Sequence, residues 1–315
     1  MNYNWSINNT AQFLKKLPQS EVYNLQIYDF TTLYTNLNLA AVEELMNEII
    51  DLLYSRTNKY ICISKFDDRC FFSKKEYNGF YCFTAALLKK AISFILYNTF
   101  VCFGGYMFHQ NKGIPMGGNS SSGIADLSLC KCEFNYMADL VRSKKLGLAK
   151  LLSANSRYVD DLIIVNYLNF ELLISTIYPS DLKMERSGNN NRDVNYLDTN
   201  VVLDGNGGAS TDLYNKLDDF NFPVVMYTFP HGNMPVNIGY NVFTSQVIRY
   251  SNIISHIHPF IIATNNLYRI LLARGYSEIA LKKKFRQLLR NRNEILLKYK
   301  VEDLKDIEDQ VFSVL

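Results

Sequence analysis

The adjacent acids Asp160 and Asp161 have the residue type and the setting of a site for a hard cation. They lie in RYVDDLIIV (157–165), where two short apolar arms predict a tight hairpin with the acids at its tip. Two neighbouring carboxylates are unfavourable unless water surrounds them or a cation neutralises them. A solvated hairpin tip is the alternative, but the apolar arms indicate the end of a buried element. Because carboxylate oxygens suit Mg²⁺, we predict a magnesium site here.

Asp29 is a further acid with the same character. It ends the strand-like LQIY (25–28) and is followed by FTTLY (30–34). Carboxylates from two strand ends can hold two metal ions about 4 Å apart, and such a pair stabilises the attacking and leaving oxygens in phosphoryl transfer. The spacing alone leaves open whether Asp29 meets Asp160.

GIPMGG (113–118) is a glycine-rich stretch that leads into a predicted helix. Its backbone N–H groups could face a phosphate or a base pair, since Gly117 and Gly118 allow close approach. An ordinary glycine-rich connection is the alternative. It is not a Walker loop, because no Lys-Ser/Thr pair follows the glycines.

The elements around these residues alternate between strand and helix up to about residue 230 and are helical from about 241. This order predicts an α+β fold. The sequence predicts helices at 39–53, capped by Asn38, at 84–97, capped by Thr84, and from Ser120 or Ser121 to Arg142. It predicts short strands within 58–82 and a hairpin at 99–110 that turns at Gly104-Gly105. A further hairpin is predicted at 183–202 with its turn at 188–191, and a further turn at 205–208.

Composition excludes several classes. Among 315 residues, 48% are hydrophobic and 20% charged, so the chain is not disordered, and a net charge of +3 is too small to indicate a partner. We find no signal peptide and no apolar run of about 20 residues, so no membrane is expected. The six cysteines are scattered, which favours a reduced, intracellular compartment. For Cys130 and Cys132, buried thiols are a better interpretation than a zinc site.

Taken in order, these segments resemble the motifs of a reverse transcriptase. DFTTLYTNL from Asp29 is similar to motif A, GIPMGGNSSSGIADLSLCKCE from Gly113 to motif B, and RYVDDLIIV from Arg157 to motif C. LYTNL, NYLDTNVV (195–202) and GYNVFTSQVIRYSNI (239–253) resemble the Penelope-like retroelement enzymes, which are related to telomerase catalytic subunits. The resemblance runs from about residue 20 to about 290.

The resemblance implies a right-hand polymerase palm, an antiparallel sheet with helices on one face, with partial fingers and a helical thumb. Residues 1–230 would form the palm with partial fingers, and residues 231–315 the thumb-like region and a short tail. The implied activity is RNA-directed DNA polymerisation, in which a nucleotide passes from a dNTP to a primer 3′-OH with two Mg²⁺, or Mn²⁺ in their place. RNA template and DNA primer would be the partners, and the location would be nuclear for a eukaryotic retroelement protein. A catalytically silent nucleic-acid-binding or scaffold protein derived from a reverse transcriptase is the alternative.

The resemblance also assigns roles to particular residues. Asp29 and Asp160 correspond to the two obligate metal ligands, Asp161 to the second carboxylate of the motif, and the carbonyl of Phe30 to a further ligand. Tyr34 matches the bulky residue that excludes the ribose 2′-OH. The remaining roles are contact with the templating base pair for Pro115, Met116 and Gly117, and contact with the duplex backbone for Arg249, Lys282, Lys283, Lys284 and Arg286. A solvated helix face is the alternative for these basic residues.

The sequence departs from the family before motif A. Only 28 residues precede Asp29, where the family carries basic finger motifs that grip the triphosphate, and Lys15 and Lys16 are the only basic residues there. Three interpretations stay open: the chain is a fragment, a further chain supplies the fingers, or the protein has moved away from polymerase work.

Overall fold

The structure is a computed structural model that describes residues 3–54, 58–220, 222, 224–235 and 237–313. The chain divides into two compact units. Residues 1–6 and 27–187 form one, which we name the motif unit because it holds the three reverse-transcriptase-like motifs. Residues 7–26 and 188–315 form the other, the C-terminal unit.

A four-stranded sheet is the centre of the motif unit. Its strand order is β7-β8-β1-β9, and the two pairings β7/β8 and β1/β9 are antiparallel. Leu162 to Val165 on β8 are buried throughout, as expected of a strand covered on both faces. The strands are β1 (Leu25–Phe30), β7 (Ser156–Tyr158), β8 (Asp161–Val165) and β9 (Met184–Ser187).

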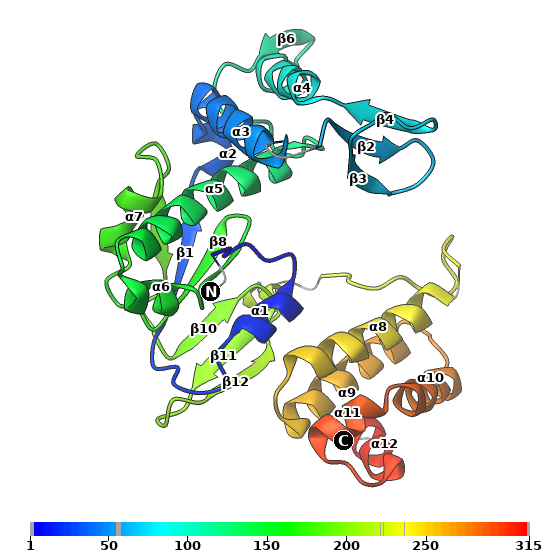
Figure 1. Cartoon of the computed structure of the whole chain (residues 1–315). Helices are drawn as coiled ribbons and strands as arrows, with labels where there is room; N and C mark the ends of the chain where they lie inside the picture. Colours follow the sequence, from blue (N-terminus) through cyan, green and yellow to red (C-terminus); the bar gives the residue numbers. More distant parts are fainter. Residues whose placement is uncertain (1–2, 55–57, 221, 223, 236, 314–315) are drawn as a thin grey trace. The chain divides into compact units, whose positions relative to one another are not determined.

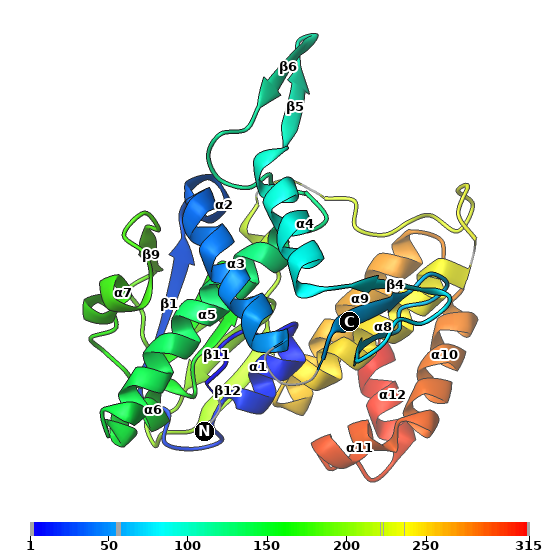
Figure 2. The same cartoon turned by 45° about the horizontal axis from the view of Figure 1, so that its top comes forward.

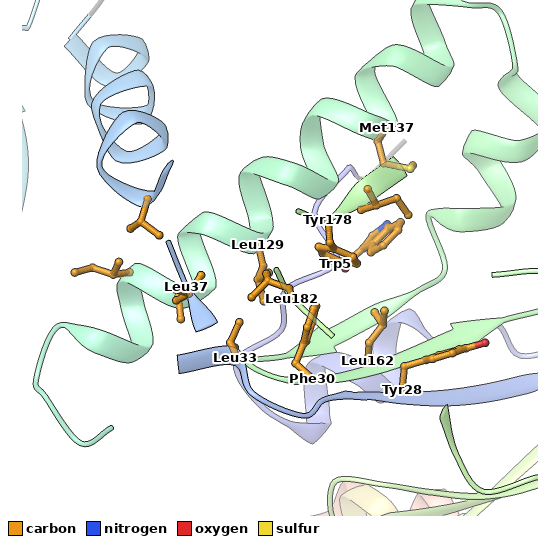
Figure 3. Packing of buried hydrophobic residues seen from close by; sticks show 14 of the residues in the cluster. Trp5, Tyr28, Phe30, Leu33, Leu37, Leu129, Met137, Leu162, Tyr178 and Leu182 are labelled. Carbon is orange, nitrogen blue, oxygen red and sulfur yellow. The ribbon is translucent and has the colours of Figure 1, made fainter. Parts of the chain in front are cut away.

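The long helix α5 (Ser121–Arg142) packs its apolar face on this sheet. Figure 3 shows Leu129 and Met137 of α5 directed toward the strands, where Phe30 and Leu162 belong to the same buried cluster. Burying each such side chain is worth about 1.5–3 kcal/mol, so this contact fixes the helix on the sheet. Four further helices of the motif unit are α2 (Leu33–Asn36), α3 (Leu39–Tyr54), α6 (Leu146–Leu152) and α7 (Glu171–Ile177) (Figure 1).

The segment between motifs A and B folds as the sequence predicts. Asn38 accepts a hydrogen bond from the N–H of Ala41 at the start of α3, and Thr84 accepts one from Leu87 at the start of α4. Gly104 and Gly105 both have positive φ (60° and 80°), which suits the hairpin turn that Figure 2 shows between β5 and β6. The elements are the sheet β3-β2-β4 of β2 (Tyr60–Ser64), β3 (Cys70–Ser73) and β4 (Phe80–Phe83), then α4 (Ala85–Tyr97), β5 (Phe100–Phe103) and β6 (Tyr106–His109).

The predicted hairpin over 183–202 is wrong. β9 pairs with β1 in the central sheet, while β10 (Asp193–Tyr196) pairs with β11 (Thr199–Leu203). The side chain of Asn190 accepts hydrogen bonds from the N–H groups of Arg192 and Asp193, so this stretch forms a local turn that separates two sheets instead of joining two paired strands. The predicted turn at 205–208 is confirmed, since it joins β11 to β12 (Ala209–Leu213).

The C-terminal unit combines the sheet β10-β11-β12 with a helical core. Phe243, Phe260 and Phe285 are fully buried in that core. Its helices are α1 (Thr10–Lys16), the 3₁₀ helix Lys216–Asp219, α8 (Asn237–Ile253), α9 (Ile257–Ala273), α10 (Glu278–Asn291), α11 (Asn293–Tyr299) and α12 (Leu304–Phe312), which confirms the helical pattern beyond about 241 (Figure 1).

The expected division at residue 230 falls inside the C-terminal unit, whereas the chain passes from one compact unit to the other after Ser6, after Gln26 and after Ser187. The functional division into palm and thumb-like region stays a prediction. Within the described ranges, no helix has the length and apolarity that crossing a membrane requires.

Candidate functional site

The motif C acids lie at the tip of a tight hairpin, as the sequence predicts. Tyr158 on β7 is directly opposite Asp161 on β8, so Val159 and Asp160 form the turn between the strands. Val159 has a φ of 54°, a left-handed conformation that is strained for a β-branched residue. Asp160 and Asp161 are both half-buried. Surrounding contacts must therefore hold the turn in place.

Arg157 supplies those contacts from beneath the turn. Its guanidinium is fully buried and donates to the carbonyl of Val159 at 2.8 Å and to the carboxylate of Asp126 at 2.8 Å. It also forms an ion pair with the fully buried carboxylate of Glu133 on α5. The N–H of Arg157 donates to the carbonyl of Trp5 at 2.7 Å. One side chain thus links the strained turn to α5.

The partner carboxylate Glu133 is held inside the motif unit by two groups. Besides Arg157, the hydroxyl of Tyr178 donates to it at 2.9 Å. Burial raises the pKa of Glu133, while the Arg157 charge and the two sets of hydrogen bonds act in the opposite direction. Burial by itself lowers the pKa of Arg157, but the charge and hydrogen bonds of Glu133 outweigh it and hold the pKa well above its ordinary value, so the guanidinium stays charged.

Sequence reasoning missed this ion pair. From the sequence, Arg157 stands out only as the first residue of motif C, and Glu133 lies inside motif B without a role. A signal was present: Glu133 lies four residues after Leu129 and four before Met137, both buried, so it occupies the apolar stripe of α5. A charged residue in such a stripe indicates a buried partner.

Asp29 lies on the strand next to the motif C hairpin. It is the penultimate residue of β1, half-buried and opposite Glu185 of β9, and β1 is the hydrogen-bonded neighbour of β8. Phe30, the last residue of β1, is buried and opposite Met184. The sheet order therefore brings motif A and motif C onto adjacent strands.

The donor set at these strands consists of carboxylate oxygens, the ligands that suit Mg²⁺. Within the described ranges, no three His, Cys, Asp or Glu side chains are grouped closely enough to hold a metal by themselves. Mg²⁺ is commonly bound by one or two carboxylates together with water and substrate phosphates, so it does not require a complete protein cage. The residue types at Asp29 and Asp160 fit such a shared site.

Tyr34 connects the three motifs. Burial raises the pKa of its phenol, and the negative charges of Asp160 and Asp126 raise it further, so the charges of both acids act on this ring. The carbonyl of Tyr34 accepts a hydrogen bond from the N–H of Ile114 at 2.8 Å. The motif A segment therefore lies against the motif B loop and close to the motif C turn.

Gly113 makes this approach possible. It has a φ of 70°, and a Cβ placed there would lie 2.3 Å from the carbonyl oxygen of Tyr34 and 2.7 Å from the Cα of Thr35. Both are backbone atoms that cannot rotate away. Any side chain at Gly113 would push the motif B loop off the motif A segment.

We expect Gly113→Ala to lower the free energy of unfolding by about 2–4 kcal/mol, since it adds a backbone clash to the strain of a positive φ. Gly117→Ala is the matched control, because Gly117 also has a positive φ (84°) but an added Cβ would meet nothing within 4 Å. The control should lose only about 1–2 kcal/mol. Urea denaturation measures both variants, and equal losses would show that the close approach does not matter.

The motif B loop presents its predicted contact residues at the surface. Pro115 is half-buried, Met116 is 69% exposed, and Gly117 is exposed. Next to this loop, Lys112 and Lys183 line one open cleft of about 900 Å³. The carbonyl of Lys183 also accepts a hydrogen bond from the N–H of Thr31 at 3.2 Å, just after motif A.

The predicted duplex-binding residues lie in the C-terminal unit, and three of them form ion pairs there. Arg249 pairs with Asp198 at 2.7 Å, Lys282 with Glu278 at 2.6 Å, and Arg286 with Glu308 at 2.7 Å. Lys283 is exposed and Lys284 half-buried on α10. Contact with phosphate would require the paired residues to exchange partners. The exposed pair of Lys282 with Glu278 is worth only about 0–1 kcal/mol. Glu308 is buried, so release of Arg286 would leave a buried carboxylate without its cation.

No family model and no curated protein matches the chain. Solved structures of telomerase are similar to it. A structure of Candida albicans telomerase in complex with the TWJ fragment of telomeric RNA has a TM-score of 0.64 and 12% identity, covering 98% of this chain and 52% of that one. Apo telomerase from Candida tropicalis has a TM-score of 0.47 and 12% identity, covering 99% of this chain and 51% of that one. Candida tropicalis telomerase in complex with the TWJ fragment has a TM-score of 0.42 and 12% identity, covering 93% of this chain and 44% of that one.

Only the first of these superpositions is close enough to support a conclusion, and at this identity the conclusion concerns the fold. The chain has a mixed α/β fold with antiparallel sheets that is similar to the fold of the reverse-transcriptase-related protein telomerase. It spans about half the length of the telomerase chain that it matches.

Proposed function

We propose that this chain is the core of an RNA-directed DNA polymerase of the reverse-transcriptase class, nearest in its motifs to the Penelope-like retroelement enzymes. One observation supports this proposal above the others. Asp29 lies on β1, and the pair Asp160-Asp161 lies at the start of β8, the neighbouring strand of the same sheet, although the two sites are far apart in the sequence. The charge of Asp160 also raises the pKa of Tyr34, to which the proposal gives a separate role in the same reaction.

In this proposal the carboxylates of Asp29 and Asp160 hold the metal ions, with Asp161 and the carbonyl of Phe30 as further ligands. Two bound Mg²⁺, or Mn²⁺, would lower the pKa of the primer 3′-OH and offset charge on the dNTP phosphates and the leaving pyrophosphate. The buried Arg157 holds the Val159 carbonyl and so positions Asp160. Its contribution is preorganisation of the turn.

In the same proposal, Tyr34 and the residues of the motif B loop select and orient the nucleotide. The ring of Tyr34 forms a wall against the ribose 2′-OH, while Pro115, Met116 and Gly117 lie against the templating base pair. Lys183 lines the cleft beside Lys112, where an ammonium could donate a proton to pyrophosphate.

The nucleic acid in this proposal is an RNA template paired with a DNA primer. Arg249, Lys282, Lys283, Lys284 and Arg286 contact the duplex phosphates from a thumb-like region within 231–315, and residues 1–230 serve as the palm with partial fingers. The matched Candida albicans telomerase was determined in complex with telomeric RNA, which agrees with an RNA ligand. For a eukaryotic retroelement protein the site of action would be nuclear.

A catalytically silent nucleic-acid-binding protein is the second candidate. The motif C turn opposes this candidate, because its backbone is strained and its two adjacent carboxylates repel each other. A scaffold protein has no need of such a turn.

Primer extension on an RNA template with dNTPs and Mg²⁺ or Mn²⁺ separates the two candidates. The polymerase proposal expects template-directed extension, and the silent candidate expects primer–template binding without extension. Binding should weaken with rising salt in both cases, because phosphate contacts release counterions. Binding with no extension under either metal would reject the polymerase proposal for this chain.

We expect Tyr34→Ala to admit ribonucleotides roughly tenfold or more readily while much of the dNTP activity remains, because the change removes a steric wall and no metal ligand. Tyr34→Phe is the control, since it keeps the ring and loses only the hydroxyl. The ratio of kcat/KM for dNTP and rNTP measures the effect. An unchanged ratio in Tyr34→Ala would place the sugar discrimination at another residue.

A further inference from the structure

Cys62 and Cys82 face each other in the three-stranded sheet of the motif unit. Cys62 is in the central strand β2, Cys82 is in β4, and the register makes them direct cross-strand partners. Their Sγ atoms are 2.8 Å apart. A disulfide bond measures about 2.05 Å, so the two sulfurs need to move by less than 1 Å to bond. This pair could not be predicted from the sequence, because the two cysteines lie twenty positions apart without a framework spacing.

The backbone also suits a bond between them. The N–H of Lys65 donates to the carbonyl of Gly79 at 3.0 Å, and this pair continues the register of β2 and β4. Hydrogen-bonded and non-hydrogen-bonded pairs alternate along antiparallel strands, so Cys62 and Cys82 form a non-hydrogen-bonded pair, in which Cα atoms are about 4.5 Å apart. That distance lies within the range of about 4.4–6.8 Å found for disulfides.

We propose that Cys62 and Cys82 form a modification site, a dithiol that a low-molecular-weight disulfide such as oxidised glutathione converts reversibly to a cross-strand disulfide. The thiolate of Cys82 attacks one glutathione sulfur, forms a mixed disulfide and releases one glutathione thiolate, which takes up the proton lost by Cys82. The thiolate of Cys62 then attacks the Cys82 sulfur and releases the second glutathione. Two protein thiols are oxidised, and one glutathione disulfide is reduced to two thiols.

The order of these steps follows from accessibility. Cys62 is fully buried, and burial raises the pKa of its thiol to about 11, whereas Cys82 is half-buried and can meet a soluble disulfide first. Exposed Cys70 and Cys102 are open to glutathione as well, but each lies opposite a residue without a thiol, Ile63 and Met107 respectively. They can form mixed disulfides and have no cross-strand partner that would resolve them.

The disulfide would close the segment 63–81, which contains β3, onto the central strand. It would tie β2 to the strand that leads directly into α4, so the whole sheet should open less readily. Oxidation of the protein would then stiffen the insertion between motifs A and B without touching the acids of the candidate site.

The test is oxidation of the folded chain with glutathione disulfide, followed by acid quenching, peptide mapping and counting of free thiols. We expect a Cys62–Cys82 linked peptide whose mass is lower by two hydrogens than the sum of the reduced peptides, and its loss on treatment with a dithiol. Hydrogen exchange within 60–83 should slow at least several-fold on oxidation. All of these readouts are independent of polymerase activity.

Cys70→Ser and Cys102→Ser are controls that should form the link as the wild type does, whereas Cys82→Ser should neither form it nor show slower exchange. Circular dichroism checks that the Cys82→Ser variant is folded. If this variant does not fold, the presence or absence of the linked peptide in the wild-type map decides the proposal. Three results would each overturn the proposal: both thiols stay free, Cys82 keeps a glutathione adduct without bonding to Cys62, or either cysteine bonds to another cysteine.

Discussion

Replacing Arg157 by methionine is expected to lower the free energy of unfolding by about 3–5 kcal/mol. Methionine keeps much of the side-chain volume but removes the cation that pairs with the buried Glu133. A buried carboxylate without its cation must either remain charged at high cost or take up a proton. The variant also loses the bond to the Val159 carbonyl that holds the strained turn.

The loss in Arg157→Met should depend on pH. Burial already raises the pKa of Glu133, and removing the neighbouring positive charge raises it further. Such a carboxyl binds its proton more tightly in the folded state, so its favourable contribution is present below the unfolded pKa and is lost as pH rises through the folded value. The deficit should therefore be smaller near about pH 5 than near about pH 8.

Two further variants make this test specific. Arg142→Met removes an arginine from an exposed pair with Asp139 on the same helix, and it should change stability by less than about 1 kcal/mol without a marked pH dependence. Adding Glu133→Gln to Arg157→Met should restore part of the lost stability and flatten the pH dependence. Urea denaturation at both pH values supplies the numbers. A loss in Arg157→Met no larger than in Arg142→Met would show that the buried pair does not hold the motif unit together.

The sequence predicted those parts of the fold that depend on neighbouring residues. Asn38 and Thr84 cap their own helices, and Gly104 and Gly105 make their own turn, so each signal acts within a few positions. The partner of β9 could not be predicted in the same way. Alternation of polar and apolar residues marks a strand, but it does not say whether the strand pairs with the next one or with β1, which lies far back in the chain.

The candidate site shows the same limit. The hairpin tip with Asp160 and Asp161 followed from two local apolar arms, and the structure confirms the hairpin. Arg157 and Glu133 could not be paired from the sequence, because a buried ion pair is defined by the packing of α5 on the sheet. The role of Tyr34, by contrast, follows from the resemblance alone, and the effect of the Asp160 charge on its pKa agrees with that role.

Asp160→Asn and Asp29→Asn are expected to abolish most primer extension. Asparagine keeps the size of the side chain but removes the charge that a metal ion requires, and metal stabilisation of the developing charge is worth several kcal/mol. A loss of about 4 kcal/mol corresponds to roughly a 10³-fold lower rate. Asp161→Asn should lose less, because the resemblance makes it the second carboxylate of the motif and not an obligate ligand.

These losses should be confined to the chemical step. Each substitution removes one negative charge from a half-buried position, so binding of primer–template should stay equal or become slightly tighter, and stability should change little. Asp139→Asn, an exposed acid on α5, is the matched control and should extend primers as the wild type does. Single-turnover extension at saturating dNTP, with duplex binding measured in parallel, separates rate from affinity. Extension by Asp160→Asn within a few-fold of wild type would mean that this carboxylate binds no catalytic metal, and the proposal that the hairpin tip is the active site would fail with it.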